Sequence, residues 1–155
     1  MHLEYLADNK FAIPILANWY FNEWGHIGNG TTLDKVKENL QDYLHTDEIP
    51  LIILAIEEGE VLGAAQLKYR EMDIYPEKEH WLGGVYVFEK YRGNKIAEKI
   101  IGRVIDIAKR LDVETLHLQT KYLNGGLYRS LGWQPLEQVN YEGVDVLVME
   151  NKICV

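Results

Sequence analysis

The sequence predicts an α/β fold: a mixed, mostly antiparallel sheet with one splayed parallel strand pair and flanking helices. Three observations favour it. Segments with continuous or alternating apolar residues are interspersed with segments whose apolar residues recur at helical spacing. Residues 80–120 form a strand–helix–strand unit, so the strands 80–88 and 113–120 should be parallel, with a right-handed crossover. The chain closes with two alternating segments that predict an antiparallel hairpin.

The first elements are a strand and two helices. Residues 2–7 alternate between apolar and polar side chains, as a half-buried strand does. A helix follows over about 10–24, with Pro14 near its start, where proline is tolerated best. Thr31 or Thr32 supplies the hydroxyl that caps a second helix, which continues to about residue 44.

The next segment predicts a hairpin and a loop. Residues 51–57 are a continuous apolar run, typical of a strand buried on both faces. Glu58-Gly59 forms a turn, and 61–70 returns as the antiparallel partner. Residues 71–79 are polar with one proline, and therefore predict a loop.

The second half of the chain continues the alternation. Gly93 or Asn94 is the expected cap of its long helix, and Gly132 is the expected stop of its short one. The predicted elements are a strand at 80–88, a helix at about 94–110, a strand at 113–120, a short helix at about 124–131 and a hairpin around Glu142-Gly143.

Composition limits the function. The chain has 155 residues, 47% of them hydrophobic and 26% charged, which predicts one globular domain over residues 1–155. The net charge of −8 argues against nucleic-acid binding, because a phosphate backbone needs a basic face. It is compatible with a cationic substrate, or it serves only solubility. No apolar run approaches the ~20 residues that span a bilayer, so no membrane association is expected.

The cysteine content and the N-terminus bear on location. The single cysteine, Cys154, cannot form an internal disulfide, which favours a reducing, cytoplasmic setting. The first ten residues show no basic segment followed by an apolar stretch, so we expect no signal peptide. With no second cysteine, we expect no structural metal site.

The start of the helix 94–110 is the first candidate site. Arg92, Gly93, Asn94 and Lys95 place two cations and a turn beside unpaired helix N–H groups. The helix dipole and these charges favour a bound anion such as a phosphate group. The spacing fits a phosphate site and a plain capped helix equally well, and it is neither a Walker loop nor a dinucleotide-binding fingerprint.

Gly83-Gly84 lies inside the strand that leads to this helix. Glycine weakens a strand and marks a bulge or the close approach of a ligand. A bulge here would separate 80–88 from 113–120. The slot between them would expose backbone N–H and C=O groups with which a ligand amide could pair.

Asn124 and Tyr128 lie four residues apart on one face of the short helix that follows. The helix would overlook the open end of the slot. A tyrosine hydroxyl, with a pKa near 10, can donate a proton to a departing thiolate in a dry site. Alternatively, Tyr128 is a core residue that packs with Leu127 and Leu131.

These pieces together resemble the GNAT superfamily of acyl-CoA-dependent N-acyltransferases. Arg92-Gly93-Asn94-Lys95-Ile96-Ala97 is similar to the family signature Arg/Gln-x-x-Gly-x-Gly/Ala, and Arg92 and Ala97 match it. Lys95 stands where the family usually has glycine. The segment from Asn124 through Leu-Tyr-x-x-Leu-Gly-Trp is the second match. The resemblance covers the order of elements over nearly the whole chain.

The resemblance implies acetyl-CoA as the co-substrate. Its pantetheine arm would lie in the slot and pair with the backbone of Val85 and Val87, and the Val87 N–H would polarise the thioester carbonyl. Asn124 would contact the pantetheine, and Tyr128 would protonate the departing thiolate. The residues that would hold the pyrophosphate are Arg92, Gly93, Asn94, Lys95, Ile96, Ala97 and Glu98.

The general base and the acceptor are less defined. Glu79 and His80, just before the glycine pair, are the leading candidates for the base. His117, Glu23 and His26 are the others. The aromatic side chains of the first helix either pack in the core or line an acceptor pocket, with residues 25–30 as a lid. The acceptor is a primary amine on a small molecule or on a peptide.

The sequence thus predicts a single-domain N-acetyltransferase that acts by direct attack of an amine in a ternary complex, as a monomer or homodimer. An acyl-enzyme through Cys154 is not expected, because Cys154 lies far in sequence from the other site elements. The alternatives are a CoA-binding sensor or partner module that lacks turnover, and an interaction domain that does not bind CoA.

Overall fold

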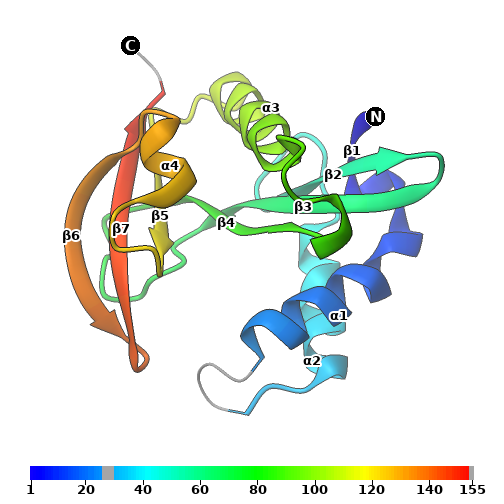
Figure 1. Ribbon diagram of the computed structural model, residues 1–155, viewed down its shortest axis with the longest axis horizontal. Helices are drawn as coiled ribbons and strands as arrows, with labels where there is room; N and C mark the ends of the chain where they lie inside the picture. Colours follow the sequence, from blue (N-terminus) through cyan, green and yellow to red (C-terminus); the bar gives the residue numbers. More distant parts are fainter. Residues whose placement is uncertain (26–29, 154–155) are drawn as a thin grey trace.

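The computed structural model describes residues 1–25 and 30–153, and shows one seven-stranded sheet with helices on both faces (Figure 1). The strand order is β1-β2-β3-β4-β5-β7-β6. All neighbouring strands are antiparallel except β4 and β5, which are parallel. The predicted fold class is confirmed.

Every strand and α-helix lies close to its predicted position. The strands are β1 (His2–Tyr5), β2 (Leu51–Glu57), β3 (Glu60–Tyr69), β4 (His80–Val87), β5 (Thr115–Thr120), β6 (Gln134–Tyr141) and β7 (Val144–Lys152). The helices are α1 (Ile13–Trp24), α2 (Leu33–Leu40), α3 (Ile96–Arg110) and α4 (Gly126–Ser130). Within the described ranges, none of the helices is long and apolar enough to cross a membrane.

Strand β2 divides the core between the two faces of the sheet. Leu51, Ile53 and Ala55 belong to the cluster that packs against α3, whereas Ile52 and Leu54 belong to the cluster under α1 and α2. Alternate side chains of a strand point to opposite faces, so a strand covered on both sides needs apolar residues throughout. The continuous apolar run is thereby explained.

The N-terminal helices form as their sequence predicts. Pro14 lies in the first turn of α1, where no backbone N–H is needed. Thr32 is the N-cap of α2, and its hydroxyl accepts the backbone N–H of Lys35 at 3.1 Å. The last predicted turn is a 3-10 turn over Gln41–Tyr43 rather than α-helix.

Helix α3 buries one face but begins differently from the prediction. Ile100 and Val104 are fully buried against the sheet. The N-cap is Lys95 rather than Gly93 or Asn94, and it has the left-handed conformation, with φ of 59°. The Asn94 side chain instead donates to the carbonyl of Tyr91 at 3.0 Å. The predicted cap was therefore wrong by one or two residues.

The parallel strands β4 and β5 separate as predicted. Their one register pair within the described residues is Trp81 with His117. Beyond it β4 carries a bulge: its register against β3 shifts opposite Ala64 and Gln66, and Gly84 has φ of +53°. Figure 1 shows the part of the sheet made by β5, β7 and β6 turning away from the part made by β1–β4.

Replacing Lys95 by glycine should stabilise the fold. A side chain in the left-handed region costs about 1–2 kcal/mol, part of which glycine loses again through its greater freedom in the unfolded chain. We expect Lys95→Gly to raise the free energy of unfolding by about 0.5–1 kcal/mol in urea titrations at an unchanged m-value.

The matched control is Lys99→Gly, four residues further along α3, where the backbone is helical and the side chain is exposed. It should lower the free energy of unfolding by about 1 kcal/mol. Destabilisation by Lys95→Gly of the same size would show that the left-handed backbone at this position costs nothing.

Candidate active site

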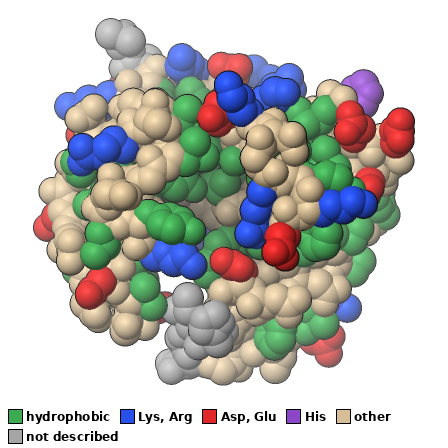
Figure 2. Space-filling view, in the orientation of Figure 1, with side chains coloured by type: hydrophobic (Ala, Val, Ile, Leu, Met, Phe, Trp, Pro, Cys, Tyr) green, Lys and Arg blue, Asp and Glu red, His purple; other side chains and the backbone are tan. Residues whose placement is uncertain are grey.

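A cleft of about 950 Å³ opens where β4 and β5 separate. Figure 2 shows a hollow near the middle of the face in view. The cleft is lined by the first turn of α3 at one end and by residues of α1, α2, β3 and the β6–β7 hairpin at the other. It therefore runs from the N-terminus of α3 through the gap in the sheet.

Strand β4 presents free backbone to this gap. The N–H of Phe88 donates to the carbonyl of Leu62 on β3 at 2.9 Å. Because backbone groups alternate sides along a strand, the N–H and C=O of Val87 point the other way, toward β5. The C=O accepts the Arg92 side chain, and the N–H is directed at the gap. Val85 lies two residues earlier and also lines the cleft. The edge of β4 can thus pair with an extended amide-bearing chain.

Arg92 and Gly93 lie at the α3 end of the cleft. The Arg92 Nε donates to the Val87 carbonyl at 2.8 Å, and its guanidinium carbon lies 5.3 Å from the centre of the Tyr86 ring. These contacts leave its terminal nitrogens available to an anion. Gly93 has φ of +87° and open space around its Cβ position, so conformation rather than crowding favours glycine there.

Tyr128 faces the cleft from α4 and also packs against the core. Its ring meets that of Trp133 edge-on, with centroids 6.2 Å apart. Burial, together with the nearby Glu71 and Tyr122, raises the pKa of Tyr128 to about 12. The hydroxyl therefore keeps its proton at neutral pH. The sequence allowed two interpretations of Tyr128, as a core residue and as a site residue, and this position is compatible with both.

Glu71 is the site residue that the sequence did not reveal. It follows β3 in the segment predicted as a polar loop, yet its side chain is only 17% exposed and lines the cleft. Its Oε1 lies 3.7 Å from the Lys68 ammonium, and a hydrogen bond to Gln119 of β5 also supports it. Burial raises the pKa of Glu71, although Lys68 and Gln119 oppose the shift.

The glycine pair makes room for this arrangement. A Cβ at Gly83 would lie 2.7 Å from Glu71 Oε1, and one at Gly84 would lie 2.6 Å from the Gln66 side chain. The carbonyl of Gly84 accepts the hydroxyl of Tyr20, on α1, at 2.8 Å. Side chains therefore pack against the bulge, and the Tyr20 hydroxyl fixes the orientation of the Gly84 carbonyl.

The model of the Acetyltransferase (GNAT) family matches residues 13–133, most of the chain. The chain belongs to the GNAT acetyltransferase family. The resemblance inferred from the sequence motifs is therefore confirmed. Among curated proteins no significant match to this sequence is found.

Solved GNAT structures share the fold at low sequence identity. A ribosomal-protein-alanine N-acetyltransferase from Brucella melitensis is 20% identical, with 98% of this chain and 99% of that chain covered and a TM-score of 0.73. An aminoglycoside 6'-N-acetyltransferase complexed with coenzyme A is 13% identical, with 100% and 98% covered and a TM-score of 0.77. A variant of spermidine N-acetyltransferase from Vibrio cholerae is 16% identical, with 99% and 95% covered and a TM-score of 0.72.

The GNAT cleft gathers most of the residues predicted for cofactor binding and catalysis, but not all. Asn94 and Asn124 are not among the lining residues, and the Asn124 Oδ1 accepts the N–H of Gly126 at 3.0 Å. The predicted residues that line the cleft are Val85, Val87, Arg92, Gly93, Lys95, Ile96, Ala97, Glu98 and Tyr128.

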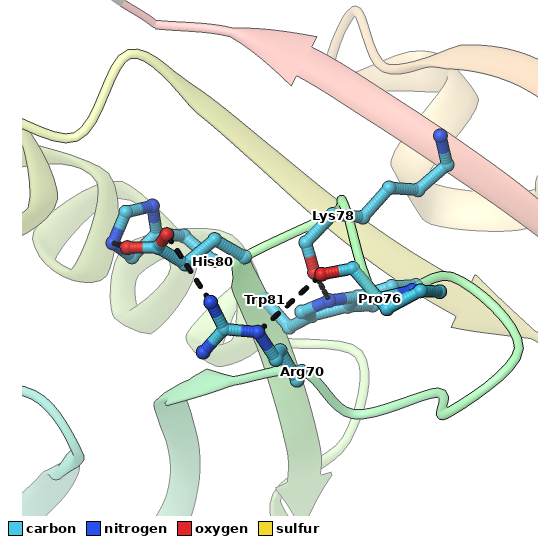
Figure 3. Close-up of polar contacts among 6 residues, drawn as sticks. Arg70, Pro76, Lys78, His80 and Trp81 are labelled. Atoms are coloured by element: carbon cyan, nitrogen blue, oxygen red, sulfur yellow. Dashed lines mark hydrogen bonds and ion pairs between the residues drawn. The ribbon is translucent and has the colours of Figure 1, made fainter.

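Glu79 and His80, the predicted bases, lie at the outer end of β4 and are not among the residues that line the cleft. Figure 3 shows the surroundings of His80, where the Arg70 Nε donates to the Pro76 carbonyl at 3.4 Å. The Arg70 guanidinium also donates to the Glu79 carboxylate at 3.4 Å. Glu79 Oε1 lies 3.2 Å from His80 Nε2, and the His80 ring packs against Tyr69. The indole N–H of Trp81 donates to the Lys78 carbonyl at 2.7 Å.

The other sequence candidates lie in different places. His117 is buried against Trp81, with ring centroids 5.5 Å apart, and burial is the main reason that its pKa is lowered. It is a packed residue of the sheet and does not line the cleft. Glu23 lines the cleft and pairs with Lys121 at 3.9 Å. His26, most of the proposed lid and Cys154 lie outside the described residues.

Substitutions at the glycine pair should separate conformation from crowding. Gly84→Ala combines a positive φ with a clash against Gln66, and should lower the free energy of unfolding by about 2 kcal/mol. Gly83→Ala meets flexible parts of the Glu71 and Lys68 side chains, and should cost about 1 kcal/mol. Urea titration measures both.

Gly102→Ala is the control, because this position in α3 has open space around its Cβ position. It should stabilise the fold by about 0.5–1 kcal/mol. Equal losses at positions 83 and 84 would contradict the distinction drawn between them.

Proposed function

We propose that this protein transfers the acetyl group of acetyl-CoA to a primary amine by direct attack in a ternary complex. The observation that carries the proposal is the opened gap between β4 and β5. It exposes the backbone of Val87 at one end and brings Tyr128 and Glu71 to the same cleft further along. The coenzyme A bound to one structural neighbour supports the choice of donor.

The α3 end of the cleft suits the pyrophosphate of acetyl-CoA. The N–H groups of the turn before α3 and of its first residues, from Gly93 to Glu98, direct their partial positive charge at an anion, and Arg92 and Lys95 add formal charge. Lys95 has the left-handed backbone that glycine adopts readily, so the N–H groups keep their direction. Asn94 and Asn124 stay predicted contacts of acetyl-CoA, although neither lines the cleft and the Asn124 Oδ1 accepts the N–H of Gly126.

The acetyl group would lie beside Val87, whose N–H supports the thioester carbonyl as negative charge develops on its oxygen. The amine nitrogen attacks the carbonyl carbon, so a C–N bond forms and the C–S bond breaks. The proton that the amine loses passes to the Glu71 carboxylate, and the hydroxyl of Tyr128 donates its proton to the departing thiolate. Glu71 replaces Glu79 and His80 as our preferred base, because it lines the cleft and they do not.

Acetyl-CoA should stabilise the protein, and Tyr128→Phe should not change that. A ligand at 100 times its dissociation constant adds about 2.7 kcal/mol, which shifts the melting temperature by roughly 5–11 °C for a chain of this length. Since the hydroxyl acts on the leaving group, Tyr128→Phe should lower turnover by roughly 100-fold or more.

The measurement is thermal unfolding with saturating acetyl-CoA, followed by turnover on a panel of amines. A shift with no turnover on any amine would favour a CoA-binding sensor instead. Absence of a shift in the wild type would contradict the proposed function.

Glu71→Gln should remove the acidic limb of the pH profile. A carboxylate acts as a base only when it is ionised. Because burial raises the pKa of Glu71, the increase of kcat/KM with pH should lie at a pH above 4.5, the ordinary pKa of glutamate. Glu71→Gln should lower kcat/KM by about 10²–10⁴-fold and flatten this limb. Glu79→Gln is the matched comparison: if it removes the limb and Glu71→Gln does not, Glu79 is the base.

A further inference from the structure

We propose that the acceptor is an α-amino acid with an apolar or aromatic side chain, whose carboxylate binds Lys68 while its amine faces Glu71. This inference rests on the proposed function for the location of the reacting amine. It is carried by a cationic side chain that lies in the cleft and has no part in the transfer described above.

Lys68 is on the acceptor side of the reacting centre. In β4 the chain runs from Trp81, opposite Lys68, through Gly83 to Val87, beside which the thioester would lie. The Lys68 Cδ would lie 3.0 Å from a Cβ built on Gly83, on the same side as the Glu71 carboxylate. The ammonium and the carboxylate therefore lie beside Gly83, on the acceptor side of the position proposed for the acetyl group, and the Glu71 charge is near enough to Tyr128 to raise the pKa of its hydroxyl.

The Lys68 ammonium is charged and has capacity to bind. The side chain is only 23% exposed, and lysine is rarely buried without a partner. Burial lowers the pKa of Lys68, but Glu71 and Tyr43 raise it by more, so the net shift is upward. The ammonium has three N–H donors, and its partners are Glu71, at 3.7 Å, and Tyr43, which leaves one donor for an anion.

The spacing of these two groups matches one small zwitterion. The carboxylate and amine of an α-amino acid are separated by a single carbon. An amine directed at Glu71 would place its own carboxylate within reach of an ammonium a few ångströms away. A charged hydrogen bond of this kind contributes about 1.5–3 kcal/mol, or roughly 10–100-fold in affinity.

The other charges at this end of the cleft do not favour a polycation. Glu23 is already paired with Lys121, and Glu142 lies at the exposed turn between β6 and β7. The charged side chains here are Glu23, Lys68, Glu71, Lys121 and Glu142, which together carry a net charge of −1. A polyamine or an aminoglycoside would need several unpaired carboxylates, and would meet the Lys68 ammonium as a like charge.

Apolar and aromatic groups complete the pocket. Trp24 of α1, Val36 and Leu40 of α2, and Tyr43 beyond α2 line this end of the cleft. These surfaces suit an apolar or aromatic side chain on the amino acid. L-Phenylalanine, L-leucine and L-tyrosine are therefore the probes, each compared with the amine that lacks its carboxylate: phenethylamine, isopentylamine and tyramine.

The experiment measures kcat/KM for each pair with acetyl-CoA, in the wild type and in Lys68→Met. At least one amino acid should be preferred over its amine by 10-fold or more, and Lys68→Met should abolish that ratio. Lys68→Arg should restore part of it. Lys68→Met also removes the charge that lowers the pKa of Glu71, and this affects the amino acid and its amine equally. The ratio of the two kcat/KM values is therefore the quantity to compare. Lys121→Met, the other ammonium here, should leave the ratio unchanged.

A second readout does not depend on turnover. With coenzyme A present, the same amino acid should raise the melting temperature of the wild type and not of Lys68→Met. Turnover of the amines without a carboxylate preference would overturn this inference and leave the proposed function standing. Stabilisation that depends on Lys68, with no turnover on any amine, would support the amino-acid site and overturn the proposed function. Absence of both effects would overturn this inference.

Discussion

The rest of the site depends on the bulge at Gly83 and Gly84 in β4. A parallel pair of strands is normally joined along its length, but in the described part of the chain β4 meets β5 in register only at Trp81. Beyond that point the bulged strand stays paired with β3 and leaves β5. The backbone groups of Val87 that would have completed the sheet instead line a cleft.

Side chains from three elements support the bulge, so it is part of the packed structure. The Tyr20 hydroxyl from α1 holds the Gly84 carbonyl, and the Gln66 and Glu71 side chains, from β3 and the loop after it, occupy the space that two Cβ atoms would fill. The same contacts place the Glu71 carboxylate in the lining of the cleft, beside Gly83. The geometry that opens the sheet thus also positions the proposed base.

The environment separates the acid from the base. Burial raises the pKa of Tyr128 to about 12, so it remains a proton donor, while Lys68 and Gln119 partly offset the effect of burial on Glu71. Burial thus raises the pKa of both groups, and the neighbouring Lys68 ammonium limits the shift at Glu71. At the far end, Lys95 keeps the left-handed backbone that a glycine would adopt at the start of α3, which preserves the direction of the N–H groups.

The sequence by itself determined the elements, their order and the family, because hydrophobic periodicity, turn residues and the motif at 92–97 are local signals. It also predicted the bulge at Gly83-Gly84 and the separated strand pair. It could not identify Glu71 or Lys68 as cleft residues, nor show that Glu79 and His80 lie outside the cleft, although all four are polar residues near the ends of β3 and β4. Which of them is buried depends on how β3, β4 and β5 are placed together, and only the tertiary structure decides that.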